Sequence, residues 1–242
     1  MTWLLALDID GTLAPIAGTP SDALVPDTVL ADLRCLAARA DVHLVFLTGR
    51  DGASAFRLVP IAQATFAPEH GACIYAPGEL QSWLAQGAKA PPLGPVLLEW
   101  EARCNPPAGA IIERKTTALA LHTRQLEPEC ASSALDAAAE LAAGLGLAVL
   151  RGRGVVEVAE RLASKRDALA SIAAAIQPSR LSYIGDDTTD IEALLWVQRQ
   201  GGEAYFVCSS ERPTSPHPDL PTLSAIESVW AWVHAHARAP DA

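Results

Sequence analysis

The 242-residue sequence lacks several features that define common functional classes. It has no run of Lys and Arg, and its net charge is −10, so nucleic acid is not expected as a partner. No apolar stretch approaches the roughly 18 residues of a membrane-spanning helix, so no membrane partner is expected either. The five cysteines contain no CxxC pair, which favours reduced thiols and a cytoplasmic location.

Several catalytic signatures are also missing. The sequence has no GxxxxGK(S/T) phosphate loop, no GxGxxG dinucleotide fingerprint and no GxSxG nucleophile motif. The six histidines form no HExxH motif, so a zinc centre of that kind is not indicated. Half of the residues are apolar, which suffices for one large core or for two smaller ones.

Apolar runs typical of buried strands alternate with helical patterns in the outer parts of the chain. The runs cover residues 3–7, 42–47, 181–184 and 204–208, and helices are predicted over 26–40, after Thr188 and over 222–236. This alternation predicts an α/β fold with a doubly wound parallel sheet, in which 204–208 would be the last strand.

The middle of the chain has a different pattern. Strand candidates at 110–113, 117–122 and 155–158 accompany a long helical pattern at 129–143. We interpret this part as a smaller α/β module inserted into the larger fold. The predicted divisions are 1–76 for the first part of the core, 77–162 for the inserted module and 163–242 for the second part of the core.

Two carboxylates directly follow the first apolar run, in the segment Asp-Ile-Asp-Gly-Thr-Leu that begins at Asp8. Asp8 and Asp10 are two residues apart, so in an extended segment their side chains point the same way. Two neighbouring anions repel each other unless a cation or a shared proton compensates. Mg²⁺ suits such a site because it prefers oxygen ligands, so we expect a Mg²⁺ cofactor.

Further polar groups follow other predicted strands. Thr48 comes after the second strand, and an acidic cluster comes after the strand at 181–184. Because parallel strands end at one edge of their sheet, these groups can meet although they are distant in sequence. Lys165 begins a helix near the same edge. The set of carboxylates, hydroxyl and lysine suits phosphoryl transfer, which needs a nucleophile and positive charge on the transferred oxygens.

The same segments resemble the four motifs of the haloacid dehalogenase superfamily. They are Asp8-Ile-Asp-Gly-Thr-Leu, Leu47-Thr48-Gly49-Arg50, Lys165, and the segment GDDTTD at 185–190. Further matches at 68–72 (PEHGA), 113–124 (ERKTTALALHTR) and 154–169 (GVVEVAERLASKRDAL) make the sequence similar to trehalose-6-phosphate phosphatases. The resemblance implies a superfamily core with an inserted cap, and hydrolysis of trehalose 6-phosphate in trehalose biosynthesis.

The resemblance also implies roles for individual residues. Asp8 would be the nucleophile, Asp10 the general acid and base, Thr48 a donor to a phosphoryl oxygen, and Lys165 its counter-charge. Mg²⁺ would be held by Asp8, Asp186 and the backbone carbonyl of Asp10. The remaining roles are an outer metal shell formed by Asp187 and Asp190, and substrate binding by Gly49, Arg50, Glu113, Lys115 and Glu157.

Some positions depart from the family pattern and leave alternatives open. Glu160 and Arg166 lie near the implied sugar site, where the family has other residues. A phosphatase for another glycosyl phosphate, such as sucrose 6-phosphate or mannosyl-3-phosphoglycerate, therefore remains an alternative, as does a phosphotransferase or mutase. Lys165 alone also fits an exposed lysine at a helix start, and Glu113 and Lys115 fit a solvated strand face. The expected partner is a small sugar phosphate, together with a possible trehalose-6-phosphate synthase.

Overall fold

The computed structural model describes residues 1–86 and 93–238 and divides the chain into two compact units. The first unit combines Met1–Ala88 with Ser164–Ala242, and the second is Lys89–Ala163. No helix among the described residues is both long and apolar enough to cross a bilayer.

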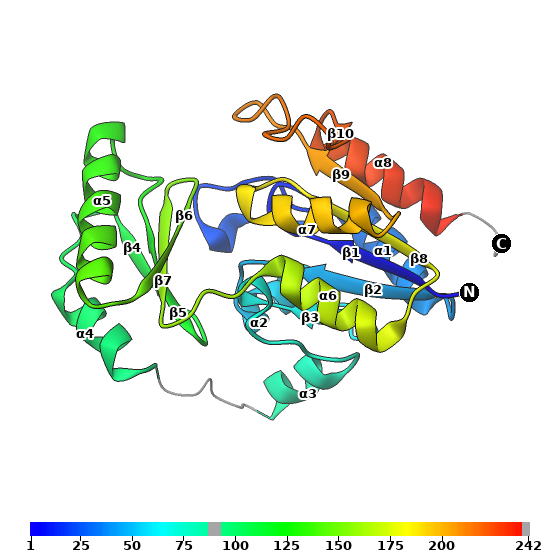
Figure 1. The fold of residues 1–242 in the computed structure, drawn as a ribbon, viewed down its shortest axis with the longest axis horizontal. Helices are drawn as coiled ribbons and strands as arrows, with labels where there is room; N and C mark the ends of the chain where they lie inside the picture. Colours follow the sequence, from blue (N-terminus) through cyan, green and yellow to red (C-terminus); the bar gives the residue numbers. More distant parts are fainter. Residues whose placement is uncertain (87–92, 239–242) are drawn as a thin grey trace. The chain divides into compact units, whose positions relative to one another are not determined.

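The first unit is built on a parallel sheet of six strands (Figure 1). In the order β10-β9-β8-β1-β2-β3, the central strand β1 pairs in parallel with β2 and β8. The strands are β1 (Trp3–Leu7), β2 (Val42–Leu47), β3 (Thr65–Ala67), β8 (Arg180–Gly185), β9 (Glu203–Val207) and β10 (Thr222–Leu223). The predicted doubly wound parallel sheet is confirmed.

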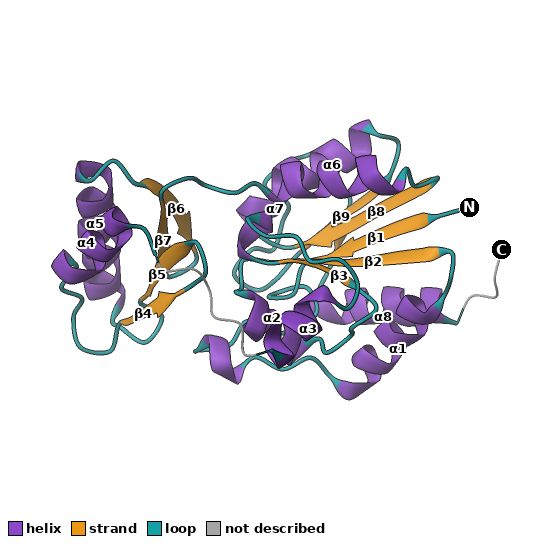
Figure 2. Ribbon diagram, turned by 90° about the horizontal axis from the view of Figure 1, so that it is seen from below, coloured by secondary structure: helices purple, strands orange, loops and turns teal. Residues whose placement is uncertain are grey.

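Helices cover both faces of this sheet (Figure 2). Leu5 and Leu7 of β1 pack in one apolar cluster with α1 (Asp27–Ala38) and α8 (Ile226–Ala237). Leu4 and Ala6 pack in a second cluster with α6 (Lys165–Ile176) and α7 (Thr188–Arg199). Alternate residues of a strand face opposite sides, so an apolar run buried on both faces forms the centre of the molecule.

The end of the chain differs from the sequence prediction. Residues 204–208 do not form the last strand, because Thr222 and Leu223 pair with Phe206 and Val207 as β10. The closing helix therefore begins at Ile226 rather than at 222. A two-residue edge strand has too little hydrophobic pattern to be distinguished from the helix that follows it.

Two further helices of the first unit are α2 (Gly52–Leu58) and α3 (Glu79–Ala85). The helix α3 lies inside the range predicted for the inserted module. In the structure, however, its Leu80 and Trp83 pack in the apolar cluster of the first unit. Burial of these two side chains associates α3 with the parallel sheet rather than with the antiparallel one.

The second unit is an antiparallel sheet with two helices on one face (Figure 1). Its strands lie in the order β4-β5-β7-β6, namely β4 (Ile111–Arg114), β5 (Ala118–His122), β7 (Val155–Ala159) and β6 (Ala148–Gly152). The helices are α4 (Pro95–Arg103) and α5 (Pro128–Gly144). Leu119 and Leu121 of β5 pack against Trp100 of α4, whose indole nitrogen donates to the backbone oxygen of Ala138 at 3.0 Å.

Candidate active site

Three loops at one edge of the parallel sheet carry the acidic and hydroxyl side chains predicted to meet there. Asp8 follows β1, Thr48 follows β2 and Asp186 follows β8. These strands are direct neighbours in the sheet, with β1 in the middle. The Asp8 N–H donates to the backbone oxygen of Ile184 at 3.0 Å, which fixes the first loop against the end of β8.

Lys165 is buried among the carboxylates at this edge. It is the first residue of α6, and 2% of its side chain is exposed. Its Nζ lies 3.0 Å from Oδ1 of Asp8 and 2.6 Å from Oδ1 of Asp190. A buried ammonium needs such partners, because an unpaired charge in the interior is strongly destabilising. Lys165 is therefore a buried counter-charge and not an exposed lysine at a helix start.

The charges in this cluster shift each other's ionisation. Burial raises the pKa of Asp8 well above its usual range; Lys165 lowers it, and the neighbouring carboxylates raise it further. Burial alone would lower the pKa of Lys165, but Asp190 and Asp8 raise it above the usual lysine range. Lys165 thus keeps its charge, and a cation beside Asp8 would favour the ionised form of that carboxylate.

Asp190 is fully occupied by hydrogen bonds. Its Oδ1 accepts from Lys165 and from the buried hydroxyl of Tyr183, and its Oδ2 accepts from the N–H groups of Asp186 and Asp187 at 3.1 and 2.9 Å. Gly185 makes room for it, since a Cβ there would lie 2.5 Å from the Asp190 Cγ. Asp190 therefore fixes the lysine and the loop after β8 at the same time.

A cation could be held at the centre of the cluster. Carboxylate oxygens of Asp8, Asp186 and Asp190 lie within 4.8 Å of one another. Because Asp190 already accepts four hydrogen bonds, the oxygens best placed to become ligands are those of Asp8 and Asp186. Such a donor set of hard anionic oxygens fits Mg²⁺. Gly11, which has φ +78°, lies directly beside Asp186. A Cβ on Gly11 would be 2.1 Å from Oδ2 of Asp186.

Asp10 is paired with Arg50 instead of lying within this cluster. The Arg50 Nε donates to Oδ2 of Asp10 at 2.6 Å, and Nη2 donates to Oδ1 at 2.7 Å. Nη1 of Arg50 donates to the backbone oxygen of Pro20 and to Oγ of Ser54. Arg50 is predicted to contact substrate, whereas its guanidinium here holds the carboxylate that is predicted to be the general acid.

Thr48 and Gly49 form the remainder of the loop after β2. Thr48 is buried, and its Oγ1 accepts from the Arg50 N–H at 3.2 Å, which leaves the Thr48 hydroxyl proton available to another acceptor. A Cβ at Gly49 would lie 2.6 Å from Cε1 of His70, so the imidazole packs directly on the glycine backbone. The His70 N–H donates to the Thr48 carbonyl at 2.8 Å, which ties the two loops together.

The structure adds Arg212, a residue that the motifs do not indicate. Arg212 lies in the loop between β9 and β10, and its Nη1 contacts both the backbone of Asp186 and the carboxylate of Asp187 at 3.1 Å. Nothing in the local sequence distinguishes Arg212 from an ordinary loop arginine, because its role depends on the neighbouring positions of β8 and β9 in the sheet.

The predicted sugar-binding residues lie in the second unit. Glu113 of β4 and Glu157 of β7 are both paired in register with Ala120 of β5, so the three side chains share one face of the antiparallel sheet. Nε2 of His122 lies 2.7 Å from a carboxylate oxygen of Glu113. Lys115 donates to Glu157, and both side chains are buried. This polar row lies on the sheet face opposite to the apolar side chains that pack against α4 and α5.

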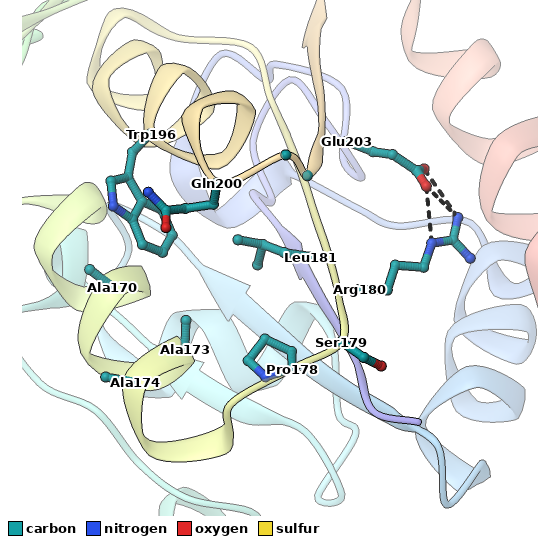
Figure 3. Close-up of a pocket in the computed structure, with 12 residues that line it drawn as sticks. Ala170, Ala173, Ala174, Pro178, Ser179, Arg180, Leu181, Trp196, Gln200 and Glu203 are labelled. Carbon is teal, nitrogen blue, oxygen red and sulfur yellow. Dashed lines mark hydrogen bonds and ion pairs between the residues drawn. The ribbon is translucent and has the colours of Figure 1, made fainter.

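A hollow of about 470 Å³ lies at the other edge of the parallel sheet (Figure 3). It is lined by α6, α7 and the starts of β8 and β9, with Trp196 and the Arg180–Glu203 ion pair at its border. Since β8 begins at this hollow and ends next to Asp186, the hollow is not part of the site around Asp8.

The sequence of this chain matches a known protein family. A family model described as trehalose-phosphatase matches residues 6–222. A probable trehalose-phosphate phosphatase from Sinorhizobium fredii is 32% identical over 238 residues, which cover 95% of this chain and 86% of that protein. An uncharacterized glycosyl hydrolase from Mycobacterium tuberculosis is also 32% identical, over 81% of this chain, but the chain spans only 15% of its length.

Solved structures show the same fold. The crystal structure of a trehalose-6-phosphate phosphatase related protein superimposes with a TM-score of 0.74, covering 97% of this chain and 96% of the other at 20% identity. At that identity the likeness concerns the fold, which is the predicted α/β fold of a parallel-sheet core with a smaller inserted α/β unit.

Proposed function

The chain belongs to the trehalose-phosphatase family of phosphoric monoester hydrolases, and from this we propose that it hydrolyses trehalose 6-phosphate to trehalose and inorganic phosphate. The observation that carries the proposal is the buried Asp8, which lies 3.0 Å from the ammonium of Lys165 and close to a second carboxylate, Asp186. A nucleophilic carboxylate next to fixed positive charge suits attack on a phosphate monoester.

In the first proposed step, a carboxylate oxygen of Asp8 attacks the phosphorus atom. The bond between phosphorus and the sugar oxygen breaks, and that oxygen takes a proton from Asp10. The product is an aspartyl-phosphate on Asp8 and free trehalose. Lys165 and the Thr48 hydroxyl balance the charge on the phosphoryl oxygens, where developing charge is stabilised most effectively by groups already in place.

In the second proposed step, water attacks the aspartyl-phosphate. Asp10, which is now ionised, accepts a proton from the water, and inorganic phosphate leaves with Asp8 restored. The same side chain therefore acts first as acid and then as base. Arg50 fixes the carboxylate of Asp10 through two hydrogen bonds, and such a bidentate pair determines the orientation of the carboxylate and favours the ionised form that accepts the proton in this step.

Mg²⁺ fits the donor set of Asp8 and Asp186, with the backbone carbonyl of Asp10 as the further proposed ligand. When bound, a divalent ion supplies charge stabilisation to the phosphoryl group and favours the ionised form of Asp8. Asp190 and Asp187 would act outside the ligand shell, because the described hydrogen bonds of Asp190 already employ both of its oxygens.

We propose that the second unit supplies sugar specificity through Glu113, Lys115 and Glu157. Carboxylates and an ammonium offer several hydrogen bonds to a polyol. Lys115 and Glu157 compensate each other's charge, and Glu113 lies within hydrogen-bonding distance of His122. A separate synthase as partner and a cytoplasmic location also stay proposals.

The test is release of inorganic phosphate from a panel of sugar phosphates, with Mg²⁺ and after metal removal by chelation. The panel contains trehalose 6-phosphate, sucrose 6-phosphate and mannosyl-3-phosphoglycerate. The proposal expects Mg²⁺-dependent release with trehalose 6-phosphate clearly preferred. If the enzyme preferred another sugar phosphate of the panel, the proposed substrate would be wrong. Full activity after metal removal would contradict the proposed Mg²⁺ requirement.

A further inference from the structure

Arg212 connects the loop that follows β9 to the loop that follows β8. Its Nη1 donates to the backbone oxygen of Asp186 and to Oδ1 of Asp187, both at 3.1 Å. The two strands are parallel neighbours, so both loops leave the same edge of the sheet. The contact thus reaches the loop that carries one carboxylate of the candidate metal site.

Arg212 is itself held in place by its surroundings. The Ser209 N–H donates to the Arg212 carbonyl at 2.9 Å, and the Arg212 N–H donates back to the carbonyl and hydroxyl oxygens of Ser209. The guanidinium carbon lies 5.9 Å from the ring centroid of Phe206, which is buried. A closed turn and an aromatic ring therefore limit the positions that the guanidinium can take.

The backbone of Asp186 is bonded from both of its sides. Its N–H donates to Oδ2 of Asp190, and its carbonyl accepts from Arg212. Fixing both groups restricts the backbone torsions of Asp186, and with them the direction in which its carboxylate points. The guanidinium also compensates the charge of Asp187, so the positive charge of a bound ion is not needed for that carboxylate.

We propose that Arg212 is a positioning residue for Asp186, holding its carboxylate where a divalent cation is bound. The inference rests on the proposed Mg²⁺ site and adds to it a residue outside the four motifs. Groups that orient metal ligands typically contribute about 10- to 100-fold to metal affinity. Loss of Arg212 should therefore weaken Mg²⁺ binding while leaving the chemical groups of the site in place.

The experiment follows the melting temperature of the metal-free protein as MgCl₂ is added, without substrate. Arg212→Ala should raise the half-saturating Mg²⁺ concentration about 10- to 100-fold. Arg212→Gln keeps a donor but loses the charge, and it should give a smaller rise in the same direction. The matched control is Arg180→Ala, which removes an arginine from an ion pair at the opposite end of β8 and β9 and should leave half-saturation unchanged (Figure 3).

A second readout separates positioning from general destabilisation. At saturating Mg²⁺, phosphate release by Arg212→Ala should return close to the wild-type kcat, because no reacting group has been removed. Unchanged half-saturation in a folded Arg212→Ala protein overturns the inference and leaves the proposed function intact. If Arg212→Ala does not fold, unchanged half-saturation in Arg212→Gln has the same meaning. Absence of any Mg²⁺ effect on the wild-type protein overturns both the inference and the metal site.

Discussion

Both carboxylate oxygens of Asp10 accept hydrogen bonds from the guanidinium of Arg50, at 2.6 and 2.7 Å. The Arg50 side chain is buried, whereas 33% of the Asp10 side chain is exposed. The remaining donor group, Nη1, is bonded to Pro20 and Ser54, so the arginine is fixed independently of Asp10. The partly exposed carboxylate of Asp10 is therefore oriented by Arg50, which is buried and held by other contacts.

Replacing Arg50 by Ala should slow the step that needs a proton. The first-turnover rate with trehalose 6-phosphate should fall about 10- to 100-fold, because a misplaced general acid loses much of its effect. With p-nitrophenyl phosphate, whose leaving group needs no proton, the first turnover should change by less than about threefold. Rapid-quench and stopped-flow measurements give the two rates.

The control for Arg50 is Arg57→Ala, in the helix α2 that follows Arg50, which removes a more distant donor to the Pro20 carbonyl. It should alter neither rate. Equal losses on both substrates in Arg50→Ala would mean that Arg50 supports the structure of the loop and does not position the acid.

Asp190→Asn should destabilise the protein strongly. The substitution leaves the Lys165 ammonium with one carboxylate partner fewer in a buried position, and breaking such a pair costs about 3–5 kcal/mol. Urea denaturation measures the loss in free energy of unfolding. The control Glu203→Gln breaks the half-exposed pair with Arg180 and should cost no more than about 1 kcal/mol. Similar losses in the free energy of unfolding in the two variants would mean that the buried Asp190–Lys165 pair is no more important for stability than a half-exposed pair.

Stability should depend on the ionisation of His43 in β2. Burial lowers the pKa of His43, and its Nε2 lies 2.9 Å from the Thr65 hydroxyl. The unfolded chain therefore binds a proton at a higher pH than the folded protein does, so this contribution is present above the unfolded pKa and is lost as pH falls through the interval between the two pKa values. His43→Gln should show a smaller drop in melting temperature between pH 7.5 and 5.5, values chosen on either side of about 6.5, the usual pKa of histidine. An equal drop would exclude His43 as a source of the pH dependence.

Lys115→Ala and Glu157→Ala should affect sugar substrates selectively. A charged hydrogen bond to a hydroxyl is worth roughly 1.5–3 kcal/mol, so kcat/KM for trehalose 6-phosphate should fall about 10- to 150-fold. Activity on p-nitrophenyl phosphate, which has no sugar, should be largely kept. Arg114→Ala, which removes an exposed ion pair with Glu101 in the same unit, is the control. If both activities fell equally, these residues would be structural.

The central strands, and the edge of the sheet that carries the candidate active site, could be predicted from the sequence for a physical reason. The strands β1 and β2 are apolar along nearly their whole length, and β8 is buried from Leu181 to Gly185, because helices bury both faces of the sheet. Functional polar residues follow where each of these strands ends. Topology then requires that these ends meet. The burial of Lys165 and its contact with Asp8 follow from this arrangement.

Other features could not be read from local pattern. The strand β6 is half-buried, so Ala148–Gly152 has little contrast between its two faces. The Arg50–Asp10 pair joins residues 40 positions apart, and the Arg212 contact depends on which strand lies beside β8. Such contacts are set by side-chain reach across neighbouring loops, which residue types and spacing do not specify.

The most direct test of the central claim is the mass of the peptide that contains Asp8 after an acid-quenched reaction. Asp10→Asn protein is mixed with p-nitrophenyl phosphate, whose leaving group departs without a proton while hydrolysis of the intermediate lacks its base. The mechanism predicts a burst of p-nitrophenol and one phosphoryl group on Asp8. A burst with an unmodified Asp8 peptide, or with the phosphoryl group on another residue, would contradict the mechanism.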